Sequence, residues 1–204
     1  MKWSRGVHHL EELARRCDTP SPVPMLPVVG LWAFGDLLGE PCDLDRVQVA
    51  VVVDLPAADV PWLDIPQGGQ HWAQAVRLRE PLVPYWRSAA LPVWNHHISR
   101  PALVWDAESG IRESTLAALH DGRGTDVRAD APTPPQLRFQ LDTELAISLR
   151  SLRRNHRAYD DKRWRPGKLE PVADSLWRAT DGYLDLLDAI APAESTPAGP
   201  RDSR

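Results

Sequence analysis

The sequence predicts an α/β protein in which a mixed β-sheet is flanked by helices and followed by a C-terminal helical hairpin. Three observations support this prediction. The run "VQVAVVV", residues 47–53, is apolar on both faces, which is typical of a strand inside a sheet with helices packed on it. Short strand-like and helix-like segments fill the chain up to residue 131. Beyond residue 132, apolar residues recur at the three- and four-residue intervals of an amphipathic helix.

Length, composition and charge bound the class of protein. The chain has 204 residues, 43% of them hydrophobic and 25% charged, which suits a globular protein with a sizeable core. A net charge of −4 gives no general signal for nucleic acid as a partner. No apolar run approaches the roughly 18 residues that a membrane helix needs, and the charged N-terminus lacks the apolar core of a secretory signal. We therefore expect a cytoplasmic protein with no membrane partner.

The elements of the first 131 residues follow from apolar spacing and turn signals. In chain order they are a helix over residues 4–17, strands over 28–34 and 47–53, a helix over 69–80, strands over 92–98 and 100–106, and a helix over 111–124 that ends at a glycine. The first helix is expected to bury Val7, Leu10 and Leu13 on one face. The prolines of residues 18–27 exclude a helix there. The short link between the last two strands predicts a hairpin.

The C-terminal part predicts two antiparallel helices. Thr133 is a favourable N-cap with Pro134 in the first helical position, and a stripe of leucines continues this helix to Leu152. The polar residues 153–168 then connect it to a second helix that begins near Pro171.

These elements predict three regions. Residues 1–131 form the α/β core, residues 132–192 the helical hairpin, and residues 193–204 a disordered tail, because the tail is small, polar and contains proline. We expect Trp177 and Tyr183 of the second hairpin helix to lie in the core.

The segment between the first two strands, "FGDLLGEPCDLD", contains a Gly-Asp turn and an Asp-Leu-Asp pair. This order of strand, glycine turn, acidic pair and buried strand resembles the nucleotidyltransferase superfamily over roughly residues 28–106. The helices after residue 132 are similar to the helical domain that often follows in that family. The resemblance implies a nucleotidyltransferase-like mixed sheet. It also implies a site where two carboxylates on one strand hold magnesium ions against the phosphates of a nucleotide.

This sequence departs from the family pattern at two places. Asp36 follows Gly35, where the family has serine or glycine. Only six residues separate Asp36 from Asp43, fewer than in the family. The family's spacing reaches Gln48 and Ala50 instead, and neither side chain is a useful magnesium ligand.

Three interpretations of this segment stay open. In the first, the site is degenerate and takes no cofactor, and the segment "WNHHISRP" contributes to a ligand site. The ligand-binding residues expected in this case are Gly35, Asp36, Gln48, Asn95 and His96. In the second, Asp43 and Asp45 are catalytic and hold Mg²⁺. In the third, the acidic segment is a solvated turn of an unrelated α/β fold, because turns favour Gly, Pro and Asp.

Residues 150–168 form the most charged segment. Arg150 and His156, with five residues between them, resemble the Arg–His motif of the HEPN family of helical ribonucleases. In that chemistry arginine stabilises the phosphate and histidine acts on the 2′-hydroxyl. On an unbroken helix the two residues face well apart, and a solvated basic face explains the same composition. We expect exposed arginines here, and nucleic-acid binding that is weak at most.

The leading hypothesis is a catalytically degenerate nucleotidyltransferase-like protein that binds a nucleotide-like ligand, an RNA or a protein partner. Its alternatives are an active magnesium-dependent nucleotidyltransferase using Asp43 and Asp45, and a HEPN-type ribonuclease using Arg150 and His156. The segments "LWAFG", "VVDLP", "VWNH" and "GYLDLLDA" also resemble a small uncharacterised bacterial family, which implies no known activity. The partner stays open, and so does homo-oligomerisation.

Overall fold

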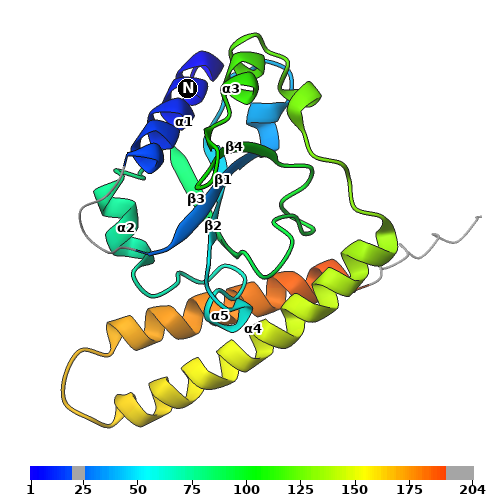
Figure 1. Cartoon of the computed structure of the whole chain (residues 1–204). Coiled ribbons are helices and arrows are strands. Elements are labelled where there is room, and N and C mark those ends of the chain that lie inside the picture. The colour runs from blue at the N-terminus through cyan, green and yellow to red at the C-terminus, as the bar shows by residue number, and fades with distance from the viewer. Residues whose placement is uncertain (20–25, 192–204) are drawn as a thin grey trace, which may run out of the picture.

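The computed structural model describes residues 1–19 and 26–191, and Figure 1 shows how their elements are arranged. The strands of these ranges are β1 (Val28–Phe34), β2 (Val47–Val53), β3 (Leu82–Ser88), β4 (Ala102–Asp106) and β5 (Gly110–Ile111). The α-helices are α1 (Trp3–Asp18), α2 (Gly69–Ala75), α3 (Glu113–His120), α4 (Pro134–Arg163) and α5 (Glu170–Ile190). The short 3₁₀ segments are η1 (Gly35–Leu38), η2 (Ala57–Asp59) and η3 (Gly124–Val127).

The strands form one mixed sheet in the order β3-β2-β1-β4-β5. β1 is antiparallel to both β2 and β4, whereas β2 and β3 are parallel and are connected through α2. β2 lies inside the sheet, and nearly all of its residues are buried on both faces. The predicted α/β fold with a mixed sheet and C-terminal helices is therefore confirmed, as is the interior position of the valine-rich strand.

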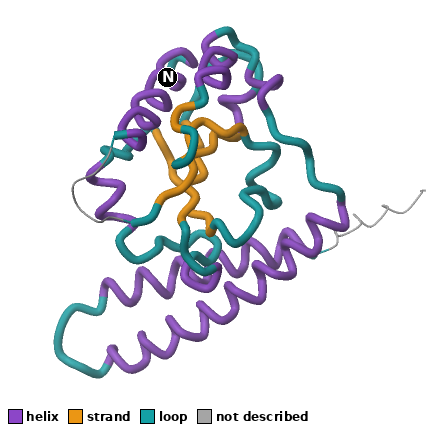
Figure 2. The backbone as a smooth tube through the Cα atoms, in the orientation of Figure 1, coloured by secondary structure: helices purple, strands orange, loops and turns teal. Residues whose placement is uncertain are grey.

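One face of the sheet packs against α1, α2 and α3, which together enclose the main core. Val7, Leu10 and Leu13 of α1 have no exposed surface, as their spacing predicted. Figure 2 shows these helices on the side of the strands away from the long helices α4 and α5. Burial of α1 along a full stripe explains why this helix forms at the N-terminus of the chain.

The other face of the sheet meets the hairpin of α4 and α5 through a smaller apolar cluster. Its buried members are Phe34, Ala50, Trp62, Ile98, Leu141 and Leu186. A close contact positions α5, because a Cβ atom at Gly182 would lie 2.1 Å from the carbonyl oxygen of Trp62. Only glycine allows the helix to lie this near the chain before α2.

β3 is a strand that the sequence analysis did not predict. Pro84 argues against a strand in the interior of a sheet, but β3 lies at the sheet edge. The Val47 N–H donates to the Pro81 carbonyl, and the Ala89 N–H donates to the Val53 carbonyl. Odd-numbered residues of β3 thus face β2, so residue 84 faces outward and a proline there removes no hydrogen bond of the ladder.

The strand predicted over residues 92–98 is wrong. The chain between β3 and β4 is a loop, drawn in teal in Figure 2. Asn95 explains this, because its side-chain oxygen accepts hydrogen bonds from the N–H groups of His97 at 3.0 Å and Ile98 at 2.9 Å. An asparagine that bonds backbone this way turns the chain instead of extending it. The predicted strand over 100–106 is confirmed as β4, but the hairpin predicted between it and residues 92–98 is wrong, because β4 instead pairs with β5 through a turn at residues 107–109.

Three helices, α2, α3 and α4, differ from prediction in length, and α3 covers only Glu113–His120 of the predicted residues 111–124. α4 begins with the expected cap at Thr133, whose hydroxyl and backbone pair with Gln136. The helix does not end near Leu152 but runs unbroken to Arg163, because its arginines favour helix and Pro166 is the next helix breaker. α2 ends at Ala75, earlier than predicted.

α5 begins close to the predicted residue, but it buries a different stripe. Its buried residues are Ala179, Gly182 and Leu186. Trp177, expected in the core, is 67% exposed, because it lines an open hollow between α5 and the edge strand β3. Tyr183 is half-buried. The predicted tail over 193–204 lies outside the described residues, as do residues 20–25 of the proline-rich segment.

Candidate functional site

The turn after β1 brings two of the expected ligand residues together. Gly35 has φ +75°, and a Cβ atom there would lie 2.2 Å from Gln48 Oε1, so only glycine fits. Gln48 lies against the turn because it pairs with Phe34 in the β1–β2 ladder. Gln48 Nε2 also lies 3.3 Å from Nε2 of His97 in the loop before β4. The β1–β2 turn and this loop therefore share one site.

Ala50 occupies the next position of β2 on the same face as Gln48, and it has no exposed surface. It lies in the apolar cluster with Phe34, Trp62 and Ile98, beneath the hairpin. A carboxylate in this place would lose its hydration without gaining a partner. The cluster therefore closes position 50 to a metal ligand.

The acidic residues of the β1–β2 connection lie on the surface. Asp36 is exposed, and so are Asp43 and Asp45 in the loop before β2, where they were expected. Leu44 between them is buried, and its carbonyl accepts a hydrogen bond of 2.5 Å from the N-terminal amine of Met1. Over residues 1–19 and 26–191, no three His, Cys, Asp or Glu side chains are grouped to hold a metal ion.

His97 lies at the centre of an aromatic cluster on the second face of the sheet. Its ring centroid is 4.8 Å from that of Tyr85, 5.9 Å from that of Phe34 and 5.8 Å from that of Trp62. Rings at these separations pack edge-to-face or tilted, and they fix the orientation of the imidazole.

The charge state of His97 depends on several neighbours. Burial lowers the pKa of His97, Asp185 raises it, and His96 and Arg46 lower it. The overall direction is downward, so the neutral imidazole is favoured. A neutral ring can both donate and accept a hydrogen bond at this site.

His96 points the other way, toward α5. Its Nε2 lies 2.7 Å from Asp185 Oδ2, and the same oxygen accepts a hydrogen bond of 2.6 Å from Trp62 Nε1. His96 Nδ1 is buried and has no hydrogen-bond partner within the described ranges. His96 therefore links the loop before β4 to the hairpin.

A buried ion pair beneath this surface joins β3 to α4. Arg87 donates to Glu144 Oε1 at 2.5 Å, and both side chains are only 3% exposed. Gln140 donates to the same carboxylate at 2.5 Å, and Asn95 donates at 3.1 Å. Arg87 also donates to the Pro92 carbonyl. Asn95, expected to bind a ligand, thus has all its polar atoms engaged within the protein.

Arginines gather around the Gly35 turn. Arg128 donates to the Gly35 carbonyl at 3.4 Å and to the Leu38 carbonyl at 3.3 Å. Burial lowers the pKa of Arg128, and the nearby Arg100 lowers it further. Arg46 lies close enough to His97 to influence its titration. None of these three arginines forms an ion pair with a residue that the structure describes, so their guanidinium groups are available to bind an anion, although the exposed Asp36 carboxylate lies at the same turn.

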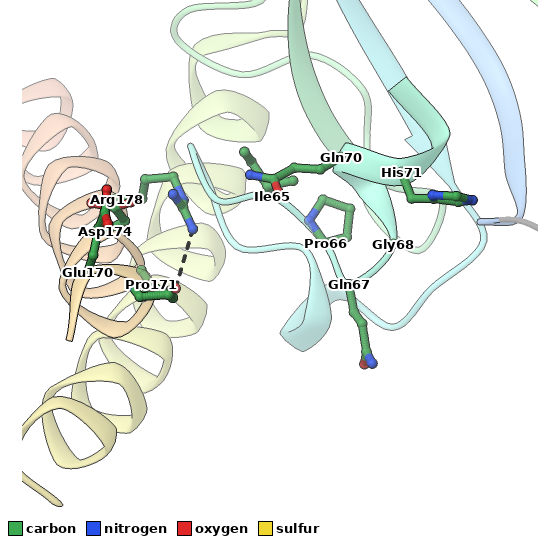
Figure 3. Close-up of a pocket in the computed structure, with 11 residues that line it drawn as sticks. Ile65, Pro66, Gln67, Gly68, Gln70, His71, Glu170, Pro171, Asp174 and Arg178 are labelled. Carbon is green, nitrogen blue, oxygen red and sulfur yellow. Dashed lines mark hydrogen bonds between the residues drawn. The ribbon is translucent and has the colours of Figure 1, made fainter. Parts of the chain in front are cut away.

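A separate cavity of about 570 Å³ lies between residues 65–71 and the first half of α5. Figure 3 shows Glu170, Asp174 and Arg178 on the α5 side of this cavity. Arg178 forms an ion pair with Asp64 at 3.2 Å, which leaves the other two acidic groups unbalanced. Phosphate is therefore disfavoured here, in contrast to the Gly35 turn.

Sequence reasoning missed eight residues of the site: Trp62, Tyr85, Arg87, Glu144, Asp185 and the arginines Arg46, Arg100 and Arg128. Tyr85 and Arg87 belong to the strand that was not predicted. Glu144 carried the one available signal, because an acidic residue interrupts the leucine stripe of α4 where the helix should be apolar.

Arg150 and His156 both lie on the unbroken part of α4 and are exposed. At about 100° per residue, they point roughly 120° apart around the helix axis. Arg153, Arg154 and Arg157 are also exposed, as predicted. Within one chain the structure does not bring the two motif residues together.

Fold and site define an α/β protein in which a helical hairpin covers one face of a mixed sheet and a polar, aromatic site forms where they meet. The chain belongs to the DUF7711 family, a domain of unknown function, whose model matches residues 1–192. No curated protein and no solved structure matches the chain. No helix in the described part of the chain has the length and apolar character needed to cross a membrane.

Proposed function

We propose that the protein is a catalytically degenerate relative of the nucleotidyltransferases, which binds a nucleotide-like anion beside the Gly35 turn and does not transfer a nucleotide. The surroundings of Gln48 and Ala50 are the observation that carries this proposal. Gln48 offers an amide where the family has a carboxylate, and Ala50 is sealed in the apolar cluster. Magnesium prefers carboxylate and phosphate oxygens, so these two positions offer it no ligand set.

Arginines supply positive charge in the place where the family uses metal ions. A guanidinium binds phosphate oxygens with two parallel hydrogen bonds and stays charged at any physiological pH. Arg46, Arg100 and Arg128 have no competing carboxylate partner within the described ranges, which supports binding of an anion without a metal. The rings of His97 and Tyr85 next to them suit stacking with a base, which is tolerant of base identity.

The test is a titration with a fluorescent ATP analogue in the presence of a metal chelator. We expect saturable binding, because the arginines replace the metal. Arg46→Glu should weaken binding at least about tenfold, which corresponds to about 1.4 kcal/mol. The control is Arg165→Glu, an exposed residue in the connection between α4 and α5, and it should bind like the wild type. Equal binding by the wild type and Arg46→Glu would contradict the location of the site.

The active alternative makes the opposite prediction. With Mg²⁺, labelled nucleoside triphosphates and RNA, we expect no incorporation into either the protein or the RNA. Incorporation that disappears in Asp43→Ala or Asp45→Ala would establish an active nucleotidyltransferase instead.

The ribonuclease alternative is tested by RNA cleavage. Because Arg150 and His156 point apart on α4, the wild type and His156→Ala should leave labelled RNA equally intact. Cleavage by the wild type that is lost in His156→Ala would favour the nuclease.

A further inference from the structure

The half of the hairpin far from the sheet buries none of its residues. From Leu152 of α4, through the connection, to Arg178 of α5, every residue is exposed or half-buried. The burial changes at both ends of this stretch, at Ser151 and Ala179, which are buried where the hairpin meets the sheet. Figure 1 shows the connection between the two helices at the end of the hairpin that extends away from the strands. We call residues 152–178 the distal half.

Several apolar side chains of the distal half remain partly or largely exposed to solvent. Leu152, Tyr159 and Leu176 are half-buried between the two helices. Trp164 is 78% exposed and Trp177 is 67% exposed. A helix gains most of its stability by packing an apolar face, and one neighbouring helix covers only part of that face. A further helical partner would complete the packing.

The two helices of the hairpin carry opposite charge. Residues 150–163 of α4 include six basic and two acidic side chains, whereas residues 170–188 of α5 include five acidic and one basic. Arg153 and Arg157 form no ion pair within the described ranges, and neither do Asp174, which lines the cavity beside residues 65–71, and Asp181, which lies one turn beyond the distal half. All four side chains are exposed. Within one chain these two sets of charges are therefore left unpaired.

We propose that the distal half is a docking surface for a second copy of this chain. In a two-fold arrangement each contact occurs twice, so α4 of one copy meets α5 of its partner and α5 meets the partner's α4. Basic and acidic stripes then face each other on both sides, and the four helices form a bundle that covers the apolar side chains. The pairing of α4 with the partner's α4 is disfavoured, because two basic stripes would repel each other.

The expected dimer is reversible. The distal half contains residues 152–163 of α4 and residues 170–178 of α5, which span roughly 18 Å and 14 Å, so a face two helices wide buries on the order of 600 Å² in total. Interfaces of this size are at the weak end of specific complexes, so we expect a dissociation constant on the order of micromolar. Since the charges are exposed, high salt should weaken the dimer.

Sedimentation velocity over a range of protein concentrations tests this proposal. The wild type should form a dimer at low salt and dissociate at high salt. Two double variants should be monomeric: Arg153→Glu/Arg157→Glu, in which the altered positions of α4 carry the same negative charge as Asp174 and Asp181 of α5, and Asp174→Arg/Asp181→Arg, in which the altered positions of α5 carry the same positive charge as Arg153 and Arg157 of α4. An equimolar mixture of the two should form a heterodimer, because each helix then meets its opposite charge. Arg5→Glu/Arg79→Glu, which reverses two exposed arginines outside the hairpin, should dimerise like the wild type.

Three results would overturn the proposal. One is a wild type that stays monomeric at all concentrations, and another is a dimer that survives both charge reversals. The third is a monomer that binds RNA through the same arginines, which would make nucleic acid the occupant of this surface. Circular dichroism of each variant checks that the fold is intact, so that loss of the dimer is assigned to the surface. Nucleotide binding at the Gly35 turn should be unchanged in all of them, which separates this proposal from the proposed function.

Discussion

At Glu144, three donors from three different segments converge on one buried carboxylate. Removing the carboxylate in Glu144→Ala leaves the Arg87 guanidinium charged and buried without a counter-ion. We expect a loss of about 3–5 kcal/mol in the free energy of unfolding, the usual range for breaking one side of a buried pair. Urea denaturation followed by circular dichroism measures it.

The matched control for Glu144 is Asp142, on the same helix. Its carboxylate pairs with Arg138 at 3.2 Å, but both side chains are more than half exposed. Asp142→Ala should change the stability by less than about 1 kcal/mol, because solvent screens an exposed pair. Similar losses in both variants would show that the buried network does not hold the hairpin on the sheet.

His97 allows a test of the electrostatics of the site. The exposed Arg46 is one of the groups that lower the pKa of His97, so Arg46→Ala should raise that pKa. An NMR titration of the imidazole proton shifts measures it, with Arg5→Ala as the control that should have no effect. Because the folded state binds this proton less readily than the unfolded state, His97 destabilises the fold as the pH falls below the ordinary value of 6.5.

Part of the site was predictable at the scale of residues. Gly35 and Gln48 could be paired from sequence, because a strand, a turn and a returning strand bring fixed positions together. Arg87 and Glu144 could not, because their contact joins an edge strand to a helix far along the chain. Asn95 was expected to bind a ligand, whereas in the structure its side chain bonds to Glu144 and to the N–H groups of His97 and Ile98, and so shapes the loop.

At the scale of elements, the alternation of N–H groups along β3, toward β2 and away from it, predicts a pattern of amide hydrogen exchange. Tyr85 and Arg87 direct their N–H groups toward β2, whereas the N–H of Trp86 points outward from the edge. Hydrogen exchange measured by NMR should therefore be slow for Tyr85 and Arg87 and faster for Trp86. Equal protection of all three amides would mean that another segment covers the edge of β3.

Elements with a strong period were predictable and irregular ones were not. α1 and β2 bury complete stripes, so their apolar spacing alone identified them. β3 was not predicted because proline is rare in strands. Pro84 is accommodated only because β3 lies at the edge of the sheet. The segment 92–98 looked extended, but a single asparagine side chain turns it. The end of α4 could not be located from the leucine stripe, because the last turns of the helix bury no side chains and so carry no apolar pattern.

At the scale of the whole molecule, the α/β part before residue 131 and the hairpin after it contribute side chains to one shared apolar cluster. Leu141 and Leu186 of the hairpin complete the cluster that contains Phe34 and Ala50. We predict that a chain ending at residue 131 loses cooperative unfolding and binds a dye specific for exposed apolar surface, because this cluster opens to water. The full chain under the same conditions should unfold in one transition. A sharp transition in the shorter chain would show that the α/β core folds alone.

The burial of Ala50 also has an evolutionary consequence. Replacing Gln48 and Ala50 with aspartates would place two carboxylates on one face of β2, but the second would enter a buried apolar cluster and destabilise the fold by several kcal/mol. A chain that had lost catalysis in this way could not regain it by reversing the two substitutions. The large side chains around position 50 would have to shrink first, and each such step would weaken the attachment of the hairpin. Under the proposed function, the cluster would therefore make the loss of a metal site hard to reverse.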